Sequence, residues 1–257
     1  MATHSWNPTQ YLQFEDERLR PALDLIARLP AGEPRLVVDL GCGAGNALPA
    51  LAARFPGARV VGVDSSAAML SKVAGKGFET IQADIGTWQP ETPPDVIFSN
   101  AALHWLGDHE RLFPRLLSLL APGGVLAVQM PAMHAAPLRA LQPVVAAKGP
   151  WAAKLAGIGS ARAILEPAGY YDVLRPLVPG LELWVTEYIH VLRGERPVVE
   201  WAKGTSLLPF LDALADTPEL RDAFLDAYAE ALAPHYPRQS DGAVLLPFRR
   251  QFILART

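Results

Sequence analysis

The most constraining feature of the sequence is the run VVDLGCGAGN from Val37 to Asn46, in which an apolar segment leads directly into closely spaced glycines. In parallel α/β proteins, a strand, a glycine-rich turn and a helix in succession bring the backbone close to a bound ligand. Gly41, Gly43 and Gly45 stand at positions one, three and five of the turn, whereas the nicotinamide-dinucleotide fingerprint has its third glycine at position six. The run therefore predicts a ligand-binding first turn and weakens the interpretation as a dinucleotide-dependent oxidoreductase.

The first half of the chain alternates short apolar runs with segments of helical pattern. This alternation favours an α/β fold with a doubly wound, mostly parallel sheet of the Rossmann-like kind. Pro49 is tolerated only in the first turn of a helix, which places that helix start near residues 46–48. The predicted strands are 36–38, 59–63, 79–82, 95–98 and 125–129, and the predicted helices are 47–55, 67–74 and 111–120.

The regular alternation of predicted strands and helices ends after Met130. Residues 133–175 are rich in Ala, Pro and Gly, residues 182–192 form a long extended run, residues 197–236 have helical character throughout, and residues 244–255 supply a last strand. We expect one domain over 1–257, with an amino-terminal helical segment (1–33), a cofactor-binding core (34–131) and a helical cap built from insertions late in the chain (133–175 and 195–240).

Composition excludes several classes of protein. The formal net charge is −3, so no overall basic field would attract nucleic acid or an anionic membrane. Half of the residues are hydrophobic, which is enough for a packed core, and a single cysteine, Cys42, excludes an internal disulfide framework. The segment Met1–Trp6 lacks the features of a secretory signal, and no apolar run approaches the roughly 18–20 residues of a membrane span. We expect a soluble, cytoplasmic protein.

Two acidic residues follow the next predicted strands. Asp64 ends the second strand and Asp84 follows the third. An ionised carboxylate only accepts hydrogen bonds, and two oxygens can accept both hydroxyls of a ribose. The glycine turn together with Asp64 and the Ala83-Asp84-Ile85 stretch resembles the class I S-adenosylmethionine-dependent methyltransferases.

This resemblance implies S-adenosylmethionine as the cofactor and a role for each matching residue. Gly41, Gly43 and Gly45 would form the loop under the methionine part, and Asp64 would hold the ribose with Ser65 behind it. Asp84 and Ile85 would frame the adenine, and Asn100 would face the methionine end. Asp39 either satisfies loop amides or faces the cofactor, and Cys42 is interpreted as a small residue that fills the turn.

Further stretches resemble one subfamily, whose members form a monomethyl ester of a small polycarboxylate such as trans-aconitate. The stretches span the chain and include WNPxxY from Trp6, NAALHWLGDH from Asn100, and GVLAVQMP from Gly124. The chain departs from the subfamily pattern at Ala132 and Met133, which replace Asp-Asn, and at Leu208, which replaces an arginine. These departures leave open an alternative acceptor: a less charged acid, a carrier-bound acyl group or a natural-product hydroxyl.

A carboxylate acceptor is already ionised at pH 7, so the predicted mechanism is positioning without a catalytic base. A hydroxyl acceptor would instead need one of the histidines, such as His104 or His109, within reach. The small-molecule carboxylate would need cations and hydroxyls around it, and no metal-ligand spacing is present. The predicted substrate-binding residues are Arg18, Trp105, Tyr170, Tyr171, Trp201 and Arg249.

Overall fold

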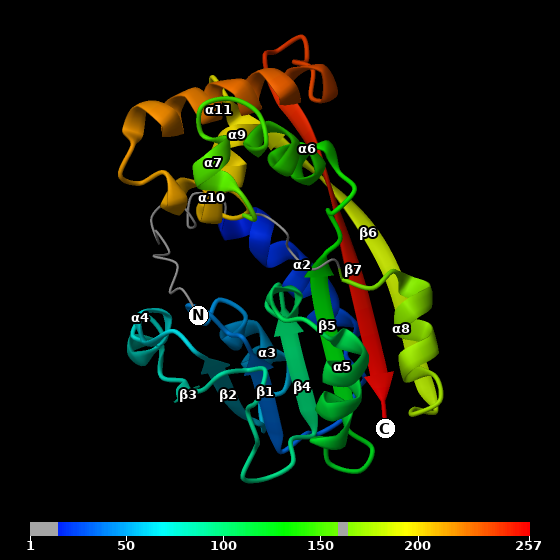
Figure 1. Ribbon diagram of the computed structural model, residues 1–257. Helices are drawn as coiled ribbons and strands as arrows, with labels where there is room; N and C mark the ends of the chain where they lie inside the picture. The colour runs from blue at the N-terminus through cyan, green and yellow to red at the C-terminus, as the bar shows by residue number, and fades with distance from the viewer. Residues whose placement is uncertain (1–14, 159–163) are drawn as a thin grey trace. The chain divides into compact units, whose positions relative to one another are not determined.

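The computed structural model describes residues 15–158 and 164–257. Its strands form one sheet in the order β3-β2-β1-β4-β5-β7-β6 (Figure 1). The first five strands pair in parallel, whereas β7 runs antiparallel to β5. The mostly parallel α/β sheet is therefore confirmed. The strand bounds are β1 (Leu36–Leu40), β2 (Arg59–Asp64), β3 (Glu79–Gln82), β4 (Val96–Asn100), β5 (Val125–Pro131), β6 (Gly180–Leu192) and β7 (Val244–Arg256).

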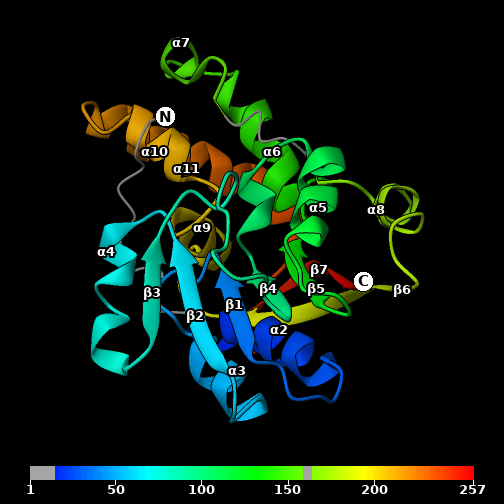
Figure 2. The same ribbon diagram turned by 90° about the horizontal axis from the view of Figure 1, so that it is seen from below.

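The central strands are mostly apolar because both of their faces are covered by helices. Figures 1 and 2 show α2 and α3 on one face of the sheet and α5 on the opposite face. Pro49 stands in the first turn of α3, which begins at Leu48 as expected. The helical elements that accompany the parallel strands are α2 (Glu15–Arg28), α3 (Leu48–Arg54), α4 (Ala67–Leu70), η1 (Ala74–Lys76), η2 (Leu103–Trp105) and α5 (His109–Ser118).

The chain divides into two compact units. The first, here called the core unit, comprises Asp16–Pro131, Arg250–Thr257 and the described part of Arg162–Thr186. The second, the helical unit, comprises Glu187–Arg249 and the described part of Ala132–Ala161. The remaining helices are α6 (Pro137–Ala146), α7 (Ala152–Leu155), α8 (Pro167–Leu174), α9 (Pro197–Lys203), α10 (Leu208–Ala213), α11 (Pro218–Leu232) and η3 (Ala233–His235).

This division differs from the predicted insertions of 133–175 and 195–240, because the helical unit extends over Glu187–Arg249. Residues 164–175, predicted as part of a cap, belong to the core unit, because α8 packs against α5 of the sheet. The predicted continuous helical region 197–236 is also broken into three helices and a short 3₁₀ turn. Pro209 and Pro218 each occupy the first turn of a new helix, where a missing backbone N–H costs nothing.

Each unit has its own hydrophobic core. In the core unit, Val38, Ile97 and Leu126 of three adjacent strands pack with Phe113 and Leu116 of α5, which lie three residues apart on one helix face. In the helical unit, the core is built around aromatic side chains and leucines of α6 and α9–α11. Every helix among the described residues is too short or too polar to traverse a bilayer.

Candidate cofactor site

Three loops of the core unit meet at the carboxyl ends of the parallel strands. The glycine turn follows β1, the turn at Asp84 follows β3, and the segment 101–106 follows β4. A Cβ added at Gly41 would lie 2.2 Å from the Cβ of Ala102 and 3.5 Å from Cδ1 of Ile85. Predicted cofactor residues from separate strands are thus brought together at the edge where ligands bind in open α/β sheets.

The glycine turn is tied to the next strand by its backbone. The N–H groups of Gly41 and Cys42 both donate to the carbonyl of Val63, at 2.7 and 3.1 Å. Gly41 has φ +85° and contacts Ala102 closely, so any side chain there would collide. Gly43 has φ +54°, but a Cβ at this position would meet nothing within 4 Å. The turn therefore leaves open space beside the Gly43 backbone, which fits a ligand that approaches it.

Asp64 fixes the conformation of both neighbouring loops. Its Oδ2 accepts the backbone N–H of Gly43 and its Oδ1 accepts that of Ser66, each at 2.9 Å. Ser66 in turn caps α4, since its Oγ accepts the Met69 N–H at 3.3 Å. Each carboxylate oxygen retains a further lone pair for a ligand. Ser65, between these two residues, is exposed.

Asp39 lies buried on β1, with 2% of its surface exposed. Burial, and secondly the charge of Asp64, raise the pKa of Asp39 to about 8. Burial also raises the pKa of the Cys42 thiol, with the charges of Asp39 and Asp64 adding to the effect. Cys42 is therefore a thiol rather than a reactive thiolate, and its sulfur lies close to Gly62, which agrees with a side chain that fills the turn.

The turn after β3 presents Asp84 at the surface and Ile85 half buried. Oδ1 of Asp84 accepts the Gly86 N–H at 2.8 Å, which closes the turn. Arg115 on α5 donates from its guanidinium to the carbonyls of Trp88 and Ile85, at 2.9 and 3.1 Å. Arg115 therefore holds this turn against the helix, a contact that the sequence pattern did not indicate.

Asn100 ends β4 beside Gln129 of β5. Oδ1 of Asn100 and Nε2 of Gln129 are buried and have no hydrogen-bond partner among the described residues. Ala101 follows with φ +52°, a conformation that a residue other than glycine seldom adopts, and its N–H donates to the Gln129 carbonyl at 2.9 Å. An unsatisfied buried acceptor beside a strained backbone residue is typical of a ligand-binding site.

Tyr170 and Trp105 were both predicted to bind substrate, but the structure places them differently. Tyr170 is fully buried, and its hydroxyl lies 2.5 Å from Nδ1 of His109. Its side chain is therefore engaged in the core rather than available to a substrate, because α8 packs inside the core unit. Trp105 and Tyr171 are exposed, at 54% and 51%. Arg18 lies in the part of α2 whose side chains are not described.

With this geometry established, comparison with known proteins identifies the family. Residues 11–171 match the family model described as "Methyltransferase domain". Two proteins named trans-aconitate 2-methyltransferase, from Methylobacterium radiotolerans and Paracidovorax citrulli, are 50% and 46% identical to this chain, with 98% of each chain covered. The chain belongs to the trans-aconitate 2-methyltransferase family.

Solved structures agree on the fold. The YcgJ protein of Bacillus subtilis superposes with a TM-score of 0.60 at 15% identity, covering 93% of this chain and 98% of the other. A crystal structure titled as a putative methyltransferase from Bacillus halodurans gives 0.54 at 17% identity, covering 92% and 97%. These solved structures confirm the predicted fold, and the family model and the two relatives confirm the predicted methyltransferase activity.

The helical unit of this methyltransferase holds two other predicted substrate residues. Trp201 is 2% exposed and its ring stacks on His190, with centroids 4.5 Å apart, so it packs in the core of that unit. Arg249 is exposed, whereas its neighbour Arg250 is buried within the core unit, where its Nη1 lies 3.4 Å from Oε1 of Gln129. Alternation along β7 predicted that these two arginines face opposite ways, and their different burial agrees with it.

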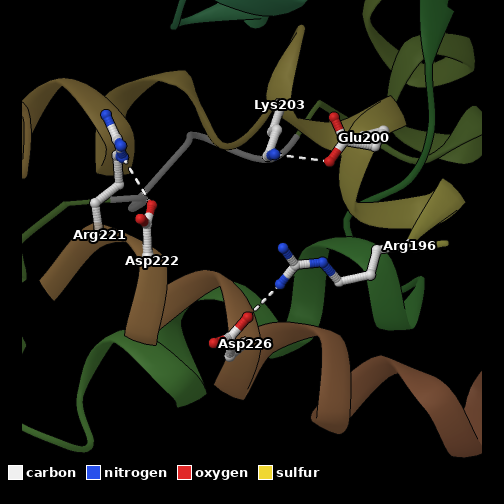
Figure 3. A network of polar contacts seen from close by, with 6 residues as sticks. All are labelled: Arg196, Glu200, Lys203, Arg221, Asp222 and Asp226. Carbon is white, nitrogen blue, oxygen red and sulfur yellow. Dashed lines mark hydrogen bonds and ion pairs between the residues drawn. The ribbon is translucent and has the colours of Figure 1, made fainter. Parts of the chain in front are cut away.

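Several charged side chains of the helical unit pair with one another at its surface. Figure 3 shows Arg196 with Asp226, Lys203 with Glu200, and Arg221 with Asp222. All three acidic partners are substantially exposed, so these pairs contribute little to stability. The arginines among them are solvated helix residues and were not among the predicted substrate ligands.

One departure from the family pattern has a local explanation. Met133 is buried in the hydrophobic cluster of the helical unit, and its sulfur accepts the N–H of Arg249 at 3.2 Å. A buried thioether suits this apolar position. Leu208 is half buried at the start of α10. No group of three or more potential ligands for a metal ion occurs within the described parts of the chain.

Proposed function

We propose that this methyltransferase transfers the methyl group of S-adenosylmethionine to one carboxylate of trans-aconitate and forms its monomethyl ester. The observation that carries the proposal is identity of 50% and 46% to two trans-aconitate 2-methyltransferases over nearly the full length of both chains. An alignment of that extent includes both units, and therefore the parts of the chain that recognise the acceptor as well as those that recognise the cofactor.

The geometry of the core unit supports a role for each predicted cofactor residue. The open space beside Gly43 would receive the methionine part, with Gly41 and Gly45 shaping the turn. Asp64 would accept the ribose hydroxyls with its remaining lone pairs. Asp84 and Ile85 would frame the adenine, and Asn100 and Asp39 would face the methionine end. Ser65 would lie behind the ribose.

Methyl transfer to a carboxylate requires few catalytic groups from the protein. S-adenosylmethionine, when bound, supplies an electrophilic methyl group whose bond to sulfur breaks as its bond to the acceptor oxygen forms. Because a carboxylate is ionised at neutral pH, no residue of this chain has to remove a proton. Both ring nitrogens of the buried His109 are engaged within the protein, which agrees with a mechanism that uses no base there. Alignment of the reactants and exclusion of water would then supply the acceleration, worth up to roughly 7–11 kcal/mol in well-oriented systems.

The acceptor is a small polyanion, so exposed cations and hydroxyls are its best ligands. Of the predicted substrate residues, Arg249, Tyr171 and Trp105 have exposed side chains and keep this proposed role. Arg18, predicted as an anchor, lies outside the described side chains. Tyr170 and Trp201 leave the set because packing already occupies them.

The decisive experiment measures which acceptor is methylated. Purified protein would be incubated with isotopically labelled S-adenosylmethionine and either trans-aconitate, citrate or crotonate, and the esters identified by mass spectrometry. We expect a monomethyl ester of trans-aconitate, with much slower reaction of crotonate, which has the same double bond but one carboxylate. Absence of any polycarboxylate ester, or faster methylation of crotonate or a hydroxyl acceptor, would overturn the proposal in favour of the less charged acceptors.

A further inference from the structure

His109 is a buried histidine whose hydrogen bonds all remain inside the core unit. It is the first residue of α5 and is 6% exposed. Its Nε2 lies 3.1 Å from the carbonyl oxygen of Leu103 and 3.2 Å from that of Leu106. Its Nδ1 lies 2.5 Å from the hydroxyl of Tyr170 on α8. One imidazole thus joins the loop after β4 to a helix that comes from a distant part of the chain.

These partners determine the tautomer. A carbonyl oxygen only accepts hydrogen bonds, so Nε2 must carry the hydrogen that is shared between Leu103 and Leu106. Nδ1 then accepts from the Tyr170 hydroxyl, and the ring is neutral. Burial lowers the pKa of His109, which favours the same neutral form. The ring also packs beside Phe113 and Tyr170, with centroids 5.4 and 5.9 Å away.

The loop that His109 holds is strained at both ends. Ala101, its first residue, has φ +52°, and Asp108, two residues after its last, has φ +54°, although neither residue is a glycine. Such conformations persist only where surrounding contacts fix them. The two bonds from Nε2 fall on the residues between them, Leu103 and Leu106, and so restrain the segment that would otherwise relax.

The same loop forms one wall of the candidate cofactor site. Ala102 contacts the glycine turn at Gly41, and a Cβ added at Gly86 would lie 3.6 Å from Cδ2 of Leu106. The loop therefore contacts both the turn after β1 and the turn after β3, which are proposed to hold the methionine part and the adenine of the cofactor. A change in its path would alter both walls together.

We propose that His109 is a positioning residue: its Nε2–H holds the 101–106 loop so that the cofactor site is formed before the cofactor arrives. This inference rests on the proposed cofactor site, although not on the identity of the acceptor. Tyr170 orients the ring from the other side but does not touch the loop.

Three substitutions test this role. His109→Gln places an amide N–H near the position of Nε2, His109→Leu removes the donor while keeping an apolar side chain of similar size, and Tyr170→Phe removes only the partner of Nδ1. The readouts are the dissociation constant of S-adenosylhomocysteine by calorimetry, KM and kcat for S-adenosylmethionine, and the melting temperature. Cofactor-product affinity is measured without any acceptor.

We expect His109→Leu to weaken S-adenosylhomocysteine binding by about tenfold or more, the scale of a lost buried hydrogen bond, and to raise KM more than it lowers kcat. His109→Gln should restore most of that affinity, and Tyr170→Phe should bind nearly as the wild type while melting at a lower temperature. If His109→Leu fails to fold, the cofactor-product affinities and melting temperatures of His109→Gln and Tyr170→Phe decide whether the inference holds.

The inference is overturned if His109→Leu binds as the wild type, if His109→Gln loses affinity despite a normal melting temperature, or if affinity simply follows melting temperature across the three variants. A wild-type protein that binds no S-adenosylhomocysteine, or forms no ester, would instead refute the proposed function. The two failures are therefore distinguishable in one set of measurements.

Discussion

Oδ2 of Asp64 accepts the backbone N–H of Gly43 at 2.9 Å, so the acid that ends β2 holds the middle of the glycine turn that follows β1. The residue proposed to bind the ribose therefore also determines the shape of the loop proposed to bind the methionine part. A substitution at Asp64 should therefore disturb both the ribose contact and the methionine contact.

Gly41→Ala and Gly43→Ala should have different main consequences: the first should impair stability and the second should impair cofactor binding. At Gly41 the new Cβ would lie 2.2 Å from Ala102, so Gly41→Ala should destabilise the protein strongly. At Gly43 the Cβ meets nothing within 4 Å and the cost is that of the left-handed conformation, roughly 1–2 kcal/mol. Gly43→Ala should therefore fold but bind S-adenosylhomocysteine at least about tenfold more weakly, because the Cβ enters the proposed ligand space. Thermal unfolding and calorimetry measure the two effects, and wild-type affinity in Gly43→Ala would contradict the assignment.

Asp39 should make stability depend on pH in a defined direction. Burial, and secondly the charge of Asp64, raise its folded pKa to about 8 from the ordinary value of 3.8, so the folded state holds a proton that the unfolded state releases. The stabilisation is complete below pH 4 and is lost as pH rises to about 8. Asp39→Asn cannot ionise, so its melting temperature relative to the wild type should rise steadily between pH 4 and 8. A difference that is the same at pH 5 and pH 8 would show that Asp39 is ionised in the folded protein.

The helical unit should be destabilised by the loss of one hydroxyl. The Tyr228 hydroxyl donates to the Leu138 carbonyl inside this unit, and its oxygen accepts from Gln142 Nε2 at 3.4 Å. Tyr228→Phe removes both of these buried hydrogen bonds, which costs about 1–3 kcal/mol in the free energy of unfolding. Denaturant unfolding would measure the loss, with Tyr171→Phe, a change at an exposed tyrosine, as the matched control. An unchanged free energy of unfolding in Tyr228→Phe would contradict this assignment of the hydroxyl.

Substitution of Leu208 tests whether the departure from the family pattern at this position affects recognition of the acceptor. Restoring arginine there adds a group that can bind a carboxylate with two parallel hydrogen bonds. Leu208→Arg should lower KM for trans-aconitate several-fold and leave S-adenosylhomocysteine affinity unchanged, with Leu208→Met as the control for size. If KM for trans-aconitate does not fall, position 208 does not contribute to recognition of the acceptor.

Local sequence patterns predicted most of the sheet and the turn. The apolar run 36–38 predicted β1, a strand that is buried on both faces, and Pro49 located the start of α3 within a residue. The helical pattern after Pro197 did not show where one helix ends and the next begins. Pro209 and Pro218 do indicate it, because each stands in the first turn of a new helix, and they divide the region into its three helices.

Other features depend on long-range contacts, which local sequence patterns do not contain. Which of Arg249 and Arg250 is buried depends on the register of β7 against β5, and alternation alone cannot supply that register. Tyr170 was selected because its stretch resembles the subfamily, and local sequence does not indicate that α8 packs on α5 and brings this tyrosine to His109. Arg115 was missed for the same reason, since its carbonyl partners lie about 30 residues earlier in the chain.

The most direct test of the account is calorimetric titration of S-adenosylhomocysteine into the wild type and into Asp64→Ala, with Glu91→Ala as the control for loss of an exposed carboxylate from the same unit. We predict a single binding site in the wild type and in Glu91→Ala, and binding weakened by about a hundredfold or more in Asp64→Ala, because a charged ligand to the ribose and the restraint on Gly43 are lost together. Wild-type affinity in a folded Asp64→Ala protein would contradict the account.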